Sequence, residues 1–172
     1  KKHPKETLIV VTADHETGGI ALGTGKYALN LKALENQKAS AEVLSKKISD
    51  LRKAKNNHVA WEDIKNLLSE EMGFWSVLPI TWEQEKKLRD EYEKSFVRNK
   101  VEFAESMYAK TEPMAAKAKE VMDQIAMVGW TSGGHSAGYV PVFAIGAGSD
   151  LFIGKMDNTE IPKRIAKAGG YK

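Results

Sequence analysis

The amino-acid sequence predicts an α/β fold that carries a large helical insertion, and three observations support this prediction. Leu8–Val11 is an apolar, mostly β-branched run, which is typical of a strand buried on both faces of a sheet. Residues 1–29 and 129–172 hold 13 of the 14 glycines, whereas the block between them contains only Gly73. Residues 30–128 also carry 17 Lys and Arg and 17 Asp and Glu, a composition typical of helices. We therefore expect residues 1–29 and 129–172 to form the α/β part and residues 30–128 to form a crown-like or lid-like insertion.

The composition excludes several classes of protein. A hydrophobic fraction of 42% is that of a globular chain, and a formal charge of +3 with no basic run argues against a nucleic-acid partner. The absence of cysteine excludes disulfides and thiolate metal sites. No stretch approaches the roughly 18 apolar residues of a membrane span, so no membrane partner is expected. Because the sequence begins at Lys1 without Met or signal peptide, we expect a fragment of a longer protein.

Within the insertion, apolar residues recur with helical spacing in four stretches, which predict helices over about 31–55, 61–72, 82–107 and 113–128. Gly73 is expected to end the second helix, and Thr81 with Gln84 predicts a capping box at the start of the third. Thr111 is expected to cap the fourth helix. These apolar stripes are most simply a core between packed helices.

After the insertion the pattern returns to strands and turns. Val140–Ile145 predicts a second buried strand, and Asp150–Gly154 predicts a short strand or loop. Asn158 is expected to cap a final helix, which Gly169 and Gly170 end.

Three side chains are candidates for metal coordination. Asp14 and His15 follow the predicted strand Leu8–Val11, and open α/β sheets bind ligands beyond the carboxyl ends of their strands. His135 lies in the glycine-rich segment 129–138. A carboxylate oxygen and imidazole nitrogens suit a catalytic zinc that keeps one position open for substrate. By itself, the Asp-His pair is equally well explained as a hydrogen-bonded pair that fixes a turn, so both interpretations stay open.

Several separate motifs agree, in order, with one known family. The segments Thr12–Gly19, Trp130–His135 and Val140–Gly148 resemble the C-terminal part of bacterial alkaline phosphatases. The tail resembles the same family at Phe152, Gly154, Asp157, Asn158, Thr159 and Ile161. The insertion matches only in position, where members of this family carry variable, often helical additions. The resemblance implies part of a doubly wound sheet of the alkaline phosphatase type.

The resemblance also implies a site and a reaction. In this family the Asp-His pair binds one zinc of a two-zinc site, and the histidine of the later loop binds the other. Asp14 and His15 would thus ligate one zinc and His135 its neighbour. The family hydrolyses phosphate monoesters through a phosphoserine intermediate, with one zinc activating the serine and the other holding the leaving-group oxygen. The implied cofactors are two zinc ions and magnesium, and the implied location is periplasmic or extracellular.

The chain departs from the family pattern because it lacks several parts of that site. Residues 1–13 contain no serine, so no catalytic nucleophile is assigned in this chain. The aspartate shared by zinc and magnesium, the other metal ligands and the phosphate-binding arginine are also missing. Ser132 and Ser136 lie in no nucleophile motif and are expected to be loop-capping hydroxyls. We therefore expect the C-terminal segment of a phosphomonoesterase, inactive by itself, whose partner is the upstream half of the same catalytic domain.

The amino-acid sequence is also compatible with two other functions. Another hydrolase of the same superfamily, a phosphodiesterase or a sulfatase, would share the metal ligands and differ in nucleophile and pocket. A non-catalytic interaction module built on the helical block would leave Asp14 and His15 purely structural. Under the leading interpretation the flanks supply only some strands of a larger sheet, so we expect self-association or a homodimer, or a partly disordered α/β portion.

Overall fold

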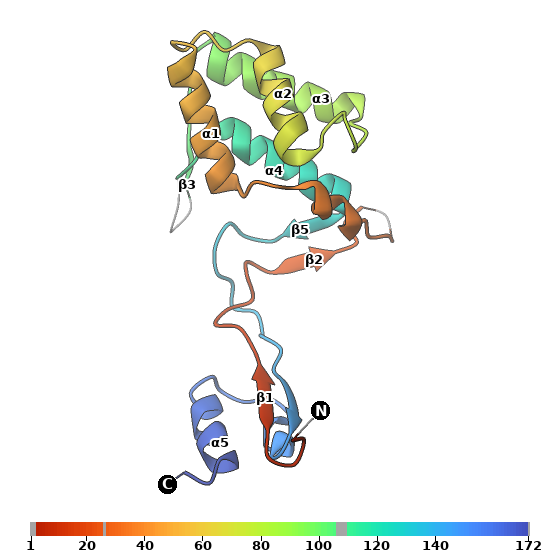
Figure 1. Cartoon of the computed structure of the whole chain (residues 1–172), viewed down its shortest axis with the longest axis vertical. Coiled ribbons are helices and arrows are strands. Elements are labelled where there is room, and N and C mark those ends of the chain that lie inside the picture. Colours follow the sequence, from red (N-terminus) through yellow and green to blue (C-terminus); the bar gives the residue numbers. More distant parts are fainter. Residues whose placement is uncertain (1–2, 26, 106–109, 172) are drawn as a thin grey trace. The chain divides into compact units, whose positions relative to one another are not determined.

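The chain forms two compact units in the computed structural model (Figure 1). The described residues are 3–25, 27–105 and 110–171. The terminal unit combines Lys1–Gly19 with His135–Lys172, and the helical unit comprises Ile20–Gly134. Within the described ranges, no helix is long and apolar enough to cross a membrane.

The terminal unit contains a two-stranded antiparallel sheet. β1 (Leu8–Val11) pairs with β6 (Phe143–Gly146), which places Ile9 opposite Ile145 and Val11 opposite Phe143. These four side chains share one face, and their exposed fractions run from 54% to 68%. The expectation that Leu8–Val11 is buried on both faces is therefore wrong for this chain. Successive side chains of a strand point to opposite faces, and here the residues alternate between half-buried and exposed.

A short 3-10 helix and a final α-helix complete the terminal unit. η3 (Ser149–Phe152) contacts both strands, and α5 (Glu160–Ala168) packs against η3. The segment expected to be a short strand or loop is thus partly helical, with Phe152 buried. Thr159, not Asn158, occupies the N-cap position of α5, and its side chain makes no capping hydrogen bond. Its amide and its hydroxyl instead donate hydrogen bonds to Asp157 Oδ1 at 3.0 and 2.7 Å. The helix ends at Gly169, as predicted.

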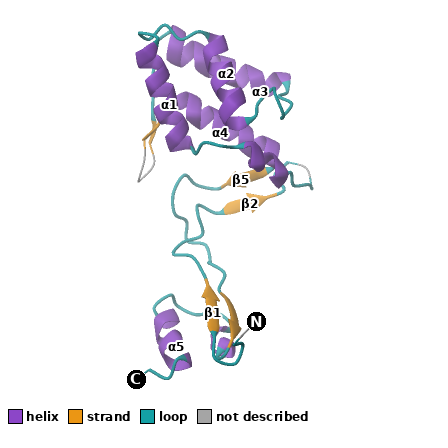
Figure 2. Ribbon diagram, in the orientation of Figure 1, coloured by secondary structure: helices purple, strands orange, loops and turns teal. Residues whose placement is uncertain are grey.

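Among the described residues, the helical unit contains four α-helices, whose packing Figure 2 shows beside the paired strands β2 and β5. The α-helices are α1 (Ala41–Ala54), α2 (Trp61–Met72), α3 (Trp82–Tyr92) and α4 (Pro113–Ala126). The shorter helical segments are η1 (Leu31–Asn36) and the π-helix η2 (Glu93–Val97). Two antiparallel pairs complete the unit: β2 (Ile20–Leu22) with β5 (Val128–Trp130), and β3 (Ala104–Glu105) with β4 (Lys110–Thr111).

The boundaries of the second and third helices agree with the sequence prediction. Gly73 ends α2 in the left-handed conformation, with φ of 70°, which glycine adopts without steric cost. Thr81 Oγ1 accepts a hydrogen bond from the Gln84 amide at 3.3 Å, and Gln84 Oε1 accepts one from the Thr81 amide at 3.0 Å. The capping box predicted at the start of α3 is confirmed.

Two predicted helices are shorter than their apolar patterns indicated. The stretch 31–55 divides into η1 and α1, because Ser40 caps a new helix by accepting a hydrogen bond from the Val43 amide at 3.2 Å. The stretch 82–107 stops at Val97, and Asn99 follows in the left-handed conformation. Phe103 lies beyond the helix and is exposed, and Met107 lies outside the described residues.

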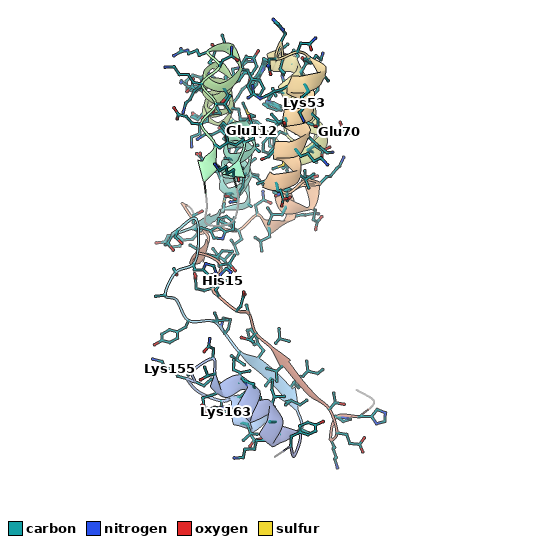
Figure 3. The ribbon with its side chains drawn as sticks, turned by 90° about the vertical axis from the view of Figure 1, so that its left-hand side faces the viewer. His15, Lys53, Glu70, Glu112, Lys155 and Lys163 are labelled. Atoms are coloured by element: carbon teal, nitrogen blue, oxygen red, sulfur yellow. The ribbon has the colours of Figure 1, made fainter. Side chains whose placement is uncertain are left out.

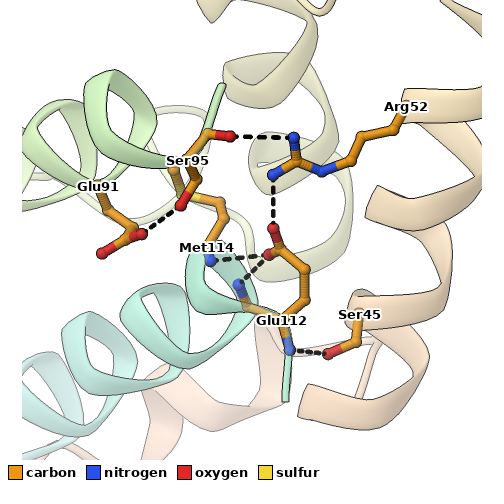
Figure 4. Close-up of polar contacts among 7 residues, drawn as sticks. Ser45, Arg52, Glu91, Ser95, Glu112 and Met114 are labelled. Carbon is orange, nitrogen blue, oxygen red and sulfur yellow. Dashed lines mark hydrogen bonds and ion pairs between the residues drawn. The ribbon is translucent and has the colours of Figure 1, made fainter. Parts of the chain in front are cut away.

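A buried polar network replaces the predicted cap of α4 (Figure 4). Glu112, not Thr111, is the N-cap, and its Oε2 accepts hydrogen bonds from the amides of Met114 and Ala115 at 2.7 and 3.1 Å. Its Oε1 pairs with Arg52 Nη2 of α1 at 2.9 Å. Thr111 instead belongs to β4. One carboxylate therefore satisfies the first amides of α4 and ties this helix to α1.

The core of the helical unit lies between its helices, as their apolar stripes predict. The residues with at most 1% exposure come from all four α-helices and include Leu44, Ile48, Ile64, Leu68, Met72, Leu88, Met114, Val121 and Met122. The last predicted stripe extends past the helix, since α4 ends at Ala126 and Val128 is buried from β5. The helical unit thus buries a continuous apolar core.

Candidate metal centre

Asp14 and His15 lie in the turn that follows β1, and Figure 3 marks His15. The His15 amide donates a hydrogen bond to Asp14 Oδ1 at 3.1 Å. The Thr17 amide donates one to His15 Nδ1 at 2.9 Å. Because an amide N–H can only donate, Nδ1 of His15 carries no proton in this arrangement. Both candidate ligands therefore help to hold the turn, while Asp14 stays exposed and His15 half-buried.

The same turn wraps its backbone around the carboxylate of Glu16. Thr17, Gly18 and Gly19 have φ values of 64°, 79° and 67°, so three successive residues adopt the left-handed conformation. This conformation is an outlier for a β-branched residue such as Thr17. The Gly18 amide donates to Glu16 Oε1 at 3.2 Å, and the Gly19 amide donates to Oε2. Successive amides thus form a small anion-binding nest that the chain fills with its own carboxylate.

Glu16 also contacts the loop that carries His135. The Ser136 amide donates a hydrogen bond to Glu16 Oε1 at 2.6 Å, which joins residues 120 positions apart. Gly138 leaves room for this contact, because a Cβ at that position would lie 2.9 Å from Glu16 Cγ. The hydrogen bond from Ser136, aided by those from Gly18 and Gly19, lowers the pKa of Glu16 to about 2. Glu16 is therefore ionised at neutral pH.

The two candidate histidines lie together in the structure. The ring centroids of His15 and His135 are 3.9 Å apart, with the ring planes at 56°. The Asp14 carboxylate, in contrast, accepts from the next amide along the chain. Within the described residues, no group of three or more His, Cys, Asp or Glu gathers as a cation site. The structure thus brings two of the three predicted ligands together, and sequence analysis missed Glu16, whose position just before a Thr-Gly-Gly turn is the signal that could have revealed it.

The serines near His135 make hydrogen bonds with neighbouring loop residues and with Glu16. Ser132 Oγ donates a hydrogen bond to the Gly134 carbonyl at 3.0 Å, and the Gly134 amide lies 3.4 Å from the same oxygen. The Ser136 amide is occupied by Glu16. For Ser132, these contacts agree with the predicted loop-capping role.

A cavity of about 730 Å³ adjoins Asp14 inside the terminal unit. Its lining includes Asp14, Tyr139, Lys155, Asp157 and Asn158. The Lys155 ammonium lies 4.5 Å from the centroid of the Tyr139 ring, a distance typical of a cation–π contact. The cavity therefore presents both signs of charge beside the candidate ligand.

The donor chemistry of these residues suits zinc. Asp14 offers a carboxylate oxygen, and His15 and His135 offer imidazole nitrogens. Three side chains are too few for two metal ions, so each ion would need further ligands. The hydrogen bond from Thr17 to His15 Nδ1 also has a consequence for metal binding. Because a neutral imidazole with an unprotonated Nδ1 carries its proton on Nε2, coordination through Nε2 requires this hydrogen bond to be given up.

Comparison with known proteins places the chain in a family. The sequence model of the alkaline phosphatase family matches residues 1–171. Alkaline phosphatase 3 of Bacillus subtilis (strain 168) is 31% identical over 181 aligned residues, which cover 99% of this chain and 32% of that protein. Alkaline phosphatase 4 of the same organism is 26% identical, with 96% of this chain and 30% of that protein covered. The chain thus spans about a third of the length of these relatives.

A solved structure agrees with the sequence comparisons. The cold-active alkaline phosphatase from a psychrophilic Shewanella sp. superposes with a TM-score of 0.62 at 25% identity, covering 98% of this chain and 35% of that one. The class of the chain is an α/β protein with small antiparallel sheets and several helices. The chain belongs to the alkaline phosphatase family.

Proposed function

We propose that this chain supplies part of the two-zinc active site of a phosphomonoesterase and is inactive by itself. The observation that carries the proposal is the approach of His15 and His135, whose ring centroids lie 3.9 Å apart although 120 residues separate them. Two imidazoles at this distance can serve neighbouring metal ions. Membership of the alkaline phosphatase family supports the same interpretation.

In this proposal each residue has a distinct task. Asp14 and His15 would hold one zinc, and His135 would hold its neighbour. When bound, the two ions activate the nucleophile and stabilise the leaving-group oxygen of a phosphate monoester. The nucleophilic serine, the magnesium ligands and the remaining zinc ligands come from a segment outside this chain, because residues 1–13 contain no serine and Ser132 is engaged with Gly134. We place the intact protein in the periplasm or outside the cell, in line with the family resemblance.

The exposed apolar surface of the terminal unit supports the proposal that the rest of the catalytic domain packs against it. Ile9, Val11, Phe143 and Ile145 form an apolar sheet face that is more than half exposed. β1 pairs only with β6 among the described strands, so this sheet also has open edges. We propose that the upstream half of the catalytic domain adds strands and helices here and completes a doubly wound sheet, with residues 30–128 as an insertion. Without that half, this face is available for self-association.

The proposal is tested in the full-length protein that contains this chain. Asp14→Ala, His15→Ala and His135→Ala are each expected to reduce bound zinc and to lower kcat/KM for an aryl phosphate by more than about 100-fold, because a lost ligand affects affinity more than the 10- to 100-fold typical of outer-shell partners. His58→Ala is the matched control, because His58 lies in the helical unit with Nδ1 2.9 Å from the Asn56 carbonyl. The 172-residue chain alone is expected to show no turnover, even with added zinc and magnesium.

The outcomes separate the proposal from its alternatives. Unchanged zinc content and activity in the Asp14 and His15 variants would favour a helical interaction module and overturn the proposal. Preferred turnover of an aryl diester or an aryl sulfate by the full-length protein would assign a phosphodiesterase or a sulfatase instead. Turnover by the isolated chain that disappears in His135→Ala would show that the missing residues are not needed.

A further inference from the structure

The carboxylate of Glu16 joins the two loops that carry the candidate histidines. It follows His15 directly in the chain, and it accepts the amide of Ser136, which follows His135. We propose that Glu16 is a positioning residue of the metal centre, which holds the His15 turn and the His135 loop in the arrangement that places their rings side by side. This inference rests on the proposed function.

The contacts of Glu16 explain why it positions both loops. Oε1 accepts the Ser136 amide at 2.6 Å and the Gly18 amide at 3.2 Å, and Oε2 accepts the Gly19 amide. Hydrogen bonds to an ionised acceptor are roughly twice as strong as those between neutral groups. One carboxylate thus anchors three backbone amides from two loops. Because each loop is anchored beside its histidine, a shift of Glu16 changes the distance between the rings.

The backbone around Glu16 is shaped for this role. Thr17, Gly18 and Gly19 take the left-handed conformation in succession, which directs the glycine amides at the carboxylate. Gly138 passes close to the Glu16 stem, and a Cβ there would lie 2.9 Å from Cγ. A rare backbone conformation on one loop and a close approach on the other therefore both serve the same side chain.

A residue that only stabilises the loops and a residue that positions metal ligands differ in what their removal changes. Removal of a purely stabilising residue would alter thermal stability and leave metal affinity unchanged. A positioning residue changes the affinity and geometry of the metal site, as outer-shell partners of metal ligands do. The measurement must therefore report on the metal itself.

The test uses the full-length holoenzyme with Glu16→Ala and Glu16→Gln. In Glu16→Ala, zinc affinity measured by chelator competition is expected to fall about 10- to 100-fold, and kcat to fall more than KM changes. The visible absorption of the cobalt-substituted protein is expected to change as the ligand geometry relaxes. Glu16→Gln is expected to be intermediate, because its amide oxygen can still accept from Gly18 and Ser136 while its NH2 group faces the Gly19 amide.

A second pair of variants acts from the opposite loop. Gly138→Ala is expected to displace Glu16 and reproduce the loss of zinc affinity, and it decides the question if Glu16→Ala fails to fold. Gly133→Ala is the matched control, because a Cβ there meets nothing within 4 Å. Glu160→Ala controls for charge, since that carboxylate pairs with Lys163 on its own helix at 2.7 Å. Both controls are expected to bind zinc as the parent protein does.

The results distinguish this inference from the proposed function. If Glu16→Ala and Gly138→Ala keep the parent zinc affinity and cobalt spectrum while His15→Ala and His135→Ala lose zinc, Glu16 is not a positioning residue and the proposed function stands. If the two histidine variants also keep zinc, the proposed function is wrong and the inference falls with it. Loss of zinc affinity in all four variants, with both controls unchanged, supports both.

Discussion

Replacement of Glu112 by alanine is expected to destabilise the helical unit by about 3–5 kcal/mol, the cost typical of breaking a buried ion pair. The Glu112 side chain is 3% exposed and its partner Arg52 is 14% exposed, so solvent screens this pair little. The substitution also leaves the buried amides of Met114 and Ala115 without their acceptor. Loss of a helix cap alone costs about 0.5–2 kcal/mol. These costs overlap, because the same carboxylate serves both contacts.

The environment of Arg52 explains why the lost ion pair with Glu112 contributes most of the expected destabilisation. Its guanidinium lies 3.5 Å from the centroid of the Phe96 ring, and its Nη1 donates to the Ser95 carbonyl at 3.2 Å. Without Glu112, this cation keeps one carbonyl and an aromatic face but loses its counter-charge. A small domain is stable by about 5–15 kcal/mol, so the variant loses a large fraction of its stability.

Urea unfolding followed by tryptophan fluorescence measures this loss, because Trp61 and Trp75 lie in or against the helical core. With a urea dependence of about 1–3 kcal/mol per molar, a loss of about 3–5 kcal/mol is expected to lower the midpoint by about 1–5 M. Glu112→Gln keeps an oxygen for the α4 amides and removes the charge, so a smaller loss is expected. Asp50→Ala is the control, because its partner Lys53 is 76% exposed and such pairs contribute about 0–1 kcal/mol. A loss below about 1 kcal/mol in Glu112→Ala would refute the reasoning.

Three further predictions concern other parts of the chain. The isolated 172-residue chain is expected to self-associate in size-exclusion chromatography. Phe143→Lys is expected to reduce this self-association, because Phe143 is 64% exposed on an apolar sheet face. A compact parent monomer with every amide protected from hydrogen exchange would contradict the prediction. Lys55 lowers the pKa of Asp63 in the folded state, so Asp63 stabilises the fold above its unfolded pKa of about 3.9 and loses this contribution as pH falls through the lower folded value. The stability difference between the parent and Asp63→Asn should therefore close on acidification, and a constant difference from pH 7 to pH 3 would be inconsistent with it. Gly73→Ala is expected to lower the unfolding free energy by about 1–2 kcal/mol, because φ is 70° there, and an unchanged denaturation midpoint would show that the turn relaxes freely.

Local sequence signals predicted the helical unit well where a single residue type decides the conformation. Gly73 ends α2 because a left-handed residue without Cβ is inexpensive there, and Thr81 with Gln84 caps α3 because both partners lie within one turn. The cap of α4 was mispredicted for the opposite reason. Thr111 is a good capping residue by type, but Glu112 also gains an ion pair with Arg52, a residue 60 positions earlier. A local sequence pattern cannot indicate this ion pair, because its two residues are far apart in the sequence.

The candidate site shows the same division. Asp14, His15 and His135 were identified as candidate ligands from their residue types and motif context, and the structure brings the two histidine rings together. Glu16 was missed because its role depends on Ser136, 120 residues away. A glutamate followed by a Thr-Gly-Gly turn does not reveal which loop it will meet.

Local patterns and motifs were enough to predict the position of most helices, the division into glycine-rich flanks and a charge-rich helical block, and the alkaline phosphatase family. These properties follow from side-chain periodicity, backbone freedom and motif order, which depend only on residues close together in the sequence or on the order of the motifs. The tertiary structure alone decided the antiparallel pairing of β1 with β6, the exposure of one sheet face and the contact of Glu16 with the His135 loop. Each of these depends on which distant segments meet, and the free energy of such contacts is set by packing and desolvation in three dimensions.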